Sequence, residues 1–155
     1  MQRLWNGKLA IVLFVLVASY APVEVFAQPI SPSANSVKIE RIVAEVRAEQ
    51  DIGKRTNLIQ KLAIDLQYVD SSSIDDEAID AITQLLLDRD DSVVNWAAGA
   101  LGNIGPRAKH AIPALEQAQA IAEMHMQAVL REHGFITGVQ AADTIRYALN
   151  KIRSR

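Results

Sequence analysis

The sequence contains no cysteine, only 5% aromatic residues and a formal net charge of −2 over 155 residues. The lack of cysteine excludes disulfide scaffolds, thiolate metal sites and cysteine nucleophiles. The small net charge gives no electrostatic footprint for nucleic-acid binding. Few aromatic residues beside abundant alanine, leucine and isoleucine favour helices over a β-sandwich. The sequence therefore predicts an all-α protein that does not bind nucleic acid.

The short motifs of common enzyme classes are also missing. The chain has no G-x-S-x-G, no H-E-x-x-H and no phosphate-binding glycine loop. Gly99 and Gly102 fall inside one expected helix, so we interpret them as packing residues. The carboxylate pair Asp75 and Asp76 falls in an expected capping turn without a partner base. We therefore predict that the protein is not an enzyme and uses no catalytic residue, metal or cofactor.

The first residues have the pattern of a secretory signal peptide. Arg3 and Lys8 precede an uncharged apolar run, residues 9–18, which is about half a membrane span. Val25 and Ala27 offer small side chains at positions −3 and −1 of a cleavage site. We expect residues 1–27 to be removed, which predicts a periplasmic or secreted protein without stable membrane insertion. An uncleaved signal anchor and a buried core helix are the alternatives.

The rest of the chain has helical spacing throughout. Residues 28–35 contain two prolines and are expected to form a linker. Beyond them the apolar residues recur every three or four positions, and no long stretch alternates with a period of two. Six helices in three hairpins are expected, over residues 36–49, 54–69, 75–87, 92–104, 107–132 and 139–153. The folded domain is accordingly assigned to residues 36–155.

The second helix of each expected hairpin carries a similar apolar pattern. Residues 59–69 repeat the pattern of residues 94–104, and residues 148–152 repeat its last five positions. Such a repeat is expected where each hairpin buries its apolar face only against its neighbours. The sequence thus predicts a short α-solenoid of about three helical hairpins.

The segment 85–115 resembles a HEAT repeat, most closely the bacterial, phycobilisome-lyase-like type. The resemblance rests on LLLDRDDSV at 85–93, AAGALGNIGP at 97–106 and AIPAL at 111–115. It implies a solenoid of helical hairpins that binds other proteins through a concave surface lined by second helices. Some relatives attach bilin chromophores, an activity for which this sequence offers no convergent polar residues.

One position departs from the pattern of the family. HEAT repeats of this type place arginine where this chain has Val94, so that it bonds the aspartates of the turn along the stack. We therefore expect Asp88 and Asp90 to lie in the turn without a basic partner, and we expect no long regular ladder. Asp91 is expected to cap the following helix.

A candidate groove follows from the faces of the second helices. Trp96 lies opposite the core stripe of its helix, and Gly99 leaves a hollow beside it. Ile64 and Tyr147 face away from the core on their own helices. Tryptophan and tyrosine are frequent interface anchors, although Trp96 could instead pack as ordinary core. The predicted partner-binding residues are Gln60, Ile64, Asn95, Trp96, Asn103 and Tyr147, with Asp143 and Asn150 beside them.

Two other clusters of residues could carry a function. The acidic residues between Asp70 and Asp91 lack the glycine and distal glutamate of a calcium loop, so we interpret them as helix caps and solvated side chains; an electrostatic patch for a basic partner is the alternative. The run Met124 to Met126, together with His133, has residue types that suit copper. Adjacent helical residues point about 100° apart, however, and we expect Met126 to join the core with Val129 and Leu130.

These features predict an exported, non-catalytic protein-binding module, a HEAT-like scaffold or adaptor whose partner is another protein. The alternative is a periplasmic accessory protein that binds a metal or a small molecule.

Overall fold

The computed structural model describes residues 31–134 and 141–154, and every regular element in these two ranges is helical. The prediction of an all-α protein is therefore confirmed for the described part of the chain. The expected signal peptide, and residues 28–30 of the expected linker, lie outside the described residues. Among the described residues, no helix is long and apolar enough to cross a membrane.

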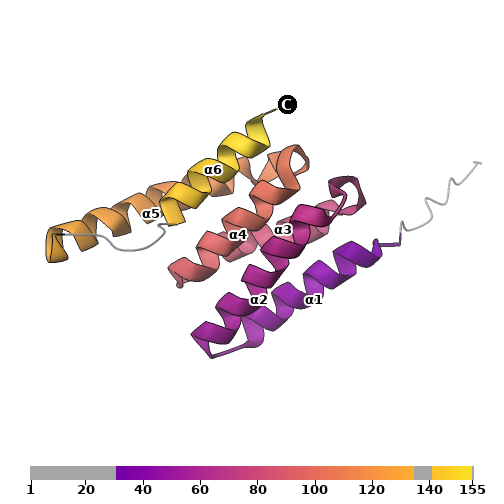
Figure 1. Ribbon diagram of the computed structural model, residues 1–155, viewed down its shortest axis with the longest axis horizontal. Helices are drawn as coiled ribbons and strands as arrows, with labels where there is room; N and C mark the ends of the chain where they lie inside the picture. The colour runs from indigo at the N-terminus through magenta and orange to yellow at the C-terminus, as the bar shows by residue number, and fades with distance from the viewer. Residues whose placement is uncertain (1–30, 135–140, 155) are drawn as a thin grey trace, which may run out of the picture. The chain divides into compact units, whose positions relative to one another are not determined.

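Within the described residues, six α-helices and four 3₁₀ segments follow one another (Figure 1). The helices are α1 Ala34–Ala48, α2 Ile52–Asp65, α3 Asp76–Thr83, α4 Asp91–Ile104, α5 Ile112–His133 and α6 Ala141–Arg153. The 3₁₀ segments are η1 Leu66–Tyr68, η2 Ser71–Ser73, η3 Gln84–Leu87 and η4 Gly105–Ala111.

Side-chain caps set where α1, α2 and α4 begin. The hydroxyl of Ser33 accepts a hydrogen bond from a backbone N–H of the first turn of α1, so this helix begins at Ala34, inside the expected linker 28–35. The carboxylate of Asp90 accepts from the backbone N–H two residues later at 2.9 Å and caps α4. The prediction that Asp91 is this cap was wrong, because Asp91 already belongs to the helix.

The expected helix over residues 107–132 divides into two segments. Gly105–Ala111 form the 3₁₀ segment η4, and α5 begins only at Ile112, with Pro113 in its first turn. Proline is favoured there because its missing N–H would have no partner inside the helix and its φ angle suits a helix start. Pro113 therefore starts α5 rather than bending a longer helix.

Helix α4 lies at the centre of the packing. It contacts α2 on one side and α6 on the other, while α1 packs against α2 and α3, and α5 packs against α6 (Figure 1). Leu101 of α4, Ile59 of α2 and Ile145 of α6 are completely buried. At Gly102 the backbones of α4 and α6 approach so closely that an added Cβ would lie 3.1 Å from the Cα and Cβ of Ala148. The row formed by α2, α4 and α6 creates the surface described below.

The second half of α5 leaves the core. Leu115 and Ala118 are the buried residues of this helix, and every residue from Gln127 to Gly134 is exposed. Val129 and Leu130 are 42% and 41% exposed. The expectation that they form core with Met126 was wrong, because both side chains are exposed on a segment of α5 that buries no residue.

Candidate partner-binding groove

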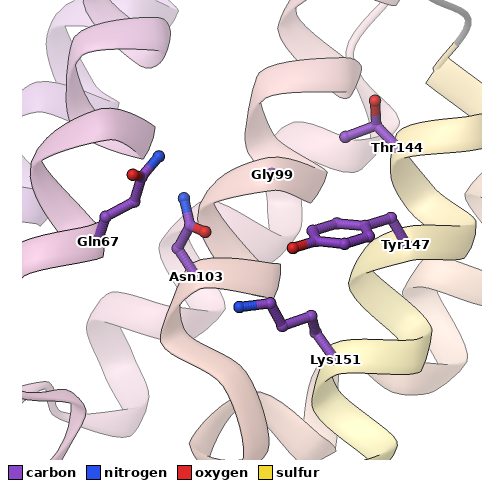
Figure 2. A pocket seen from close by; sticks show the side chains of 6 residues that line it. All are labelled: Gln67, Gly99, Asn103, Thr144, Tyr147 and Lys151. Atoms are coloured by element: carbon purple, nitrogen blue, oxygen red, sulfur yellow. The ribbon is translucent and has the colours of Figure 1, made fainter.

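A cavity of about 430 Å³ lies where η1, α4 and α6 meet. Figure 2 shows its six lining residues, of which one comes from η1 and the others from α4 and α6. They are Gln67, Gly99, Asn103, Thr144, Tyr147 and Lys151. We call this surface the groove. Its apolar parts include the ring of Tyr147 and the methyl group of Thr144, and the other side chains that line it are polar.

Two glycines of α4 have opposite effects on the groove. At Gly102 the contact with Ala148 closes the interface between α4 and α6. One turn earlier, an added Cβ at Gly99 would meet only the methyl group of Thr144, at 3.9 Å. The interface is therefore tight at Gly102 and open at Gly99, which leaves a hollow there that Trp96 does not line.

Asn103 is held in one orientation at the bottom of the groove. Its Nδ2 donates a hydrogen bond of 2.8 Å to the carbonyl oxygen of Ala63 in α2. Figure 2 shows its Oδ1 on the side of Tyr147, away from that bond. The bond also ties α4 to α2, so Asn103 both supports the fold and presents a fixed acceptor to the cavity.

Tyr147 and Lys151 form the wall that α6 contributes. Both side chains extend from α6 toward α4, as Figure 2 shows. The Lys151 ammonium lies 5.8 Å from the centre of the Tyr147 ring, within the range of a cation–π contact. Tyr147 is 57% exposed, so its ring and hydroxyl are available to a ligand.

The structure brings two of the six predicted site residues, Asn103 and Tyr147, together in the groove. The other four lie outside its lining. Gln60 is half-buried on α2, and Ile64 is 42% exposed on the same helix. Trp96 is half-buried and packs against the core, and the Oδ1 atom of Asn95 is buried.

Three lining residues were missed by the sequence reasoning. Thr144 and Lys151 lie three residues before and four residues after Tyr147, which is the spacing that shares one helical face. The sequence reasoning chose Asp143 and Asn150 instead, each one residue earlier than the lining residue. Gln67 follows Ile64 by three residues and could have been found by the same rule.

The turn before α4 has a basic partner after all. The guanidinium of Arg55 in α2 bonds the carboxylate of Asp88, and both side chains are largely buried. Arg55 also donates from Nε to the carbonyl oxygen of Val46 at 3.1 Å, and the other carboxylate oxygen of Asp88 accepts from the backbone N–H of Asp90. The expectation that this turn lacks a basic partner was wrong, because the arginine comes from the preceding hairpin rather than from position 94.

The acidic residues between 70 and 91 have local partners. The carboxylate of Asp75 accepts a hydrogen bond of 2.9 Å from the backbone N–H of Ser33, and this bond lowers the pKa of Asp75. Hydrogen bonds from the N–H and hydroxyl of Ser72 lower the pKa of Asp70 in the same way. Asp76 pairs with Arg107 at 2.9 Å. These contacts agree with the interpretation of the acids as caps and surface partners.

The two histidines of the candidate copper cluster, His125 and His133, lie eight residues apart on α5. Nδ1 of His125 is 3.5 Å from the carboxylate of Asp91, and His133 is 3.9 Å from its neighbour Glu132. Met124 is 62% exposed. Within residues 31–134 and 141–154, no three side chains of His, Asp or Glu come together as a metal site.

Comparisons with protein families, with curated proteins and with solved structures find no match to this chain.

Proposed function

We propose that this protein is an exported, non-catalytic protein-binding module, a scaffold or adaptor that holds a segment of another protein in the groove. The observation that carries the proposal is the cavity of about 430 Å³ between the second helices of successive hairpins. An exposed tyrosine beside a polar rim is the usual composition of a protein-recognition surface. The rigid helices on either side would present this surface with little reorganisation.

The wider identification rests on the sequence. The resemblance of residues 85–115 to a HEAT repeat supports a short α-solenoid, and the contacts of α4 with both α2 and α6 agree with a stack of hairpins. The signal-peptide pattern of residues 1–27 supports export from a bacterial cell to the periplasm or beyond. The partner in this proposal is a protein, not nucleic acid.

Affinity capture from a bacterial envelope fraction tests the proposal when two exposed side chains are compared. Tyr147→Ala removes the aromatic wall of the groove, and Met124→Ala removes a similarly exposed side chain from α5. We expect the proteins retained by the wild-type chain to be lost with Tyr147→Ala and kept with Met124→Ala. Equal recovery with wild type and Tyr147→Ala would contradict the proposal that partner proteins bind in the groove.

A second candidate is a small-molecule-binding accessory protein. The groove volume favours it, since small-molecule sites commonly measure about 300–1,000 Å³. A thermal-shift screen of small organic ligands separates the two candidates, because a ligand that binds only the folded chain raises its melting temperature. A shift abolished by Tyr147→Ala would favour the small-molecule function.

A further inference from the structure

The groove carries a positive charge that has no acidic partner. Among the described residues that line it, Lys151 is the only cation, and none is acidic. The neighbouring cations of α6 are both neutralised, Arg146 by Asp143 and Arg153 by Glu116. Among the described residues Lys151 forms no ion pair, although the whole chain has a net charge of −2. The groove is thus locally positive on a chain of negative net charge, and it attracts an anionic group.

The groove also presents a hydrogen-bond acceptor of fixed orientation, the Oδ1 atom of Asn103. The bond from Nδ2 of Asn103 to Ala63 fixes the side-chain amide, so Oδ1 stays on the side of Tyr147 (Figure 2). Within the described part of the chain this oxygen accepts no hydrogen bond. A simple anion would meet the lone pairs of Oδ1, which disfavours it. The ligand that fits must bring an N–H donor as well as a negative charge.

The backbone at Gly99 adds a third requirement. With no side chain there, an extended ligand can lie close to α4, and only the methyl group of Thr144 borders the space. An extended peptide combines backbone N–H groups with side-chain carboxylates. It therefore meets the charge, the acceptor and the shape of the groove at once.

We infer that the groove binds an extended acidic segment of a protein, with one Asp or Glu carboxylate at Lys151 and a backbone N–H at Oδ1 of Asn103. The Tyr147 hydroxyl lies beside Lys151 and donates a further hydrogen bond to the carboxylate (Figure 2). This inference rests on the proposed function and names the chemistry of its partner.

Selection from a random peptide library against the full-length chain tests this inference. Lys151→Gln removes the charge of the groove, and Lys109→Gln removes an exposed charge from η4, away from the groove. We expect Asp and Glu to be enriched among peptides retained by wild type and by Lys109→Gln, but not by Lys151→Gln. A selected peptide should bind Lys151→Gln about fivefold more weakly, the effect of one partly exposed ion pair. Replacing its Glu by Gln should weaken binding to wild type by the same factor.

Three results would overturn the inference. They are the absence of acidic enrichment with wild type, equal enrichment with Lys151→Gln, and displacement of the peptide by free succinate at the same concentration as by unlabelled peptide. The last result would assign the groove to small carboxylates. Loss of captured partners with Tyr147→Ala would still support the protein-binding groove in each case. Unchanged capture with Tyr147→Ala would contradict the proposal that the groove binds a protein.

Discussion

Helix α4 and the second half of α5 have similar apolar spacing but opposite surroundings. In α4, eight of the fourteen residues are buried, because α2, α3, η3, η4 and α6 all pack against it. In α5, Leu115 and Ala118 are the buried residues, Ile121 and Ala122 are half-buried, and Val129 and Leu130 are exposed. Spacing predicts that a segment is helical, whereas burial depends on a neighbouring helix that the segment itself does not encode.

The largest effect should come from matched truncations in the two helices. Leu101→Ala in α4 removes a completely buried side chain, and we expect it to lower the free energy of unfolding by about 3–4 kcal/mol. Leu130→Ala in α5, which is 41% exposed, should cost less than about 1 kcal/mol. Urea denaturation of the two variants measures the difference. Equal losses would mean that α5 is covered to its end.

Arg55→Ala should have the next largest effect. The substitution leaves the Asp88 carboxylate, whose side chain is 12% exposed, without its charge partner. We expect a loss of about 2–3 kcal/mol, below the value for a fully buried pair because some solvent reaches the site. Lys38→Ala breaks an exposed pair with Asp65 and should cost at most about 1 kcal/mol. Similar losses for both variants would show that the Arg55 pair does not hold the turn before α4.

The two glycines of α4 give a smaller but sharper contrast. Gly102→Ala places a Cβ 3.1 Å from Ala148, and the forced separation of α4 and α6 should cost about 1–2 kcal/mol. Gly99→Ala has room beside Thr144 and should raise stability by up to about 1 kcal/mol, because alanine favours a helix. Opposite shifts in melting temperature are the expected result. Two losses would indicate that the groove is closed at Gly99.

The smallest effect concerns the pH dependence near α1. Hydrogen bonding from the Ser33 backbone N–H, with a further contribution from Ser36, lowers the folded-state pKa of Asp75 below its ordinary value of 3.8. The resulting stabilisation is complete above pH 3.8 and is lost as the pH falls through the lower, folded-state pKa. Asp75→Asn should therefore flatten part of the acid-side fall in melting temperature. Identical pH profiles for variant and wild type would show that Asp75 does not contribute to the pH dependence of stability.

The sequence predicted where the chain is helical well, but it predicted poorly how the helices pack against one another. The buried positions Ile59, Leu101 and Ile145 follow from spacing within single helices. The pair of Arg55 with Asp88 joins residues 33 positions apart, so it depends on how two hairpins pack. The groove residues Thr144 and Lys151 are a different case, since their spacing from Tyr147 places all three on one face of α6 and could have predicted them.

The most direct test of the proposed function fills the groove from its floor. In Gly99→Leu the new side chain would extend into the cavity from a position with open space around the Cβ. The proposal predicts that the variant keeps the wild-type melting temperature to within a few degrees and loses, in affinity capture, the proteins that the wild-type chain retains. Retention of the same proteins at wild-type yield by a folded Gly99→Leu chain would contradict it.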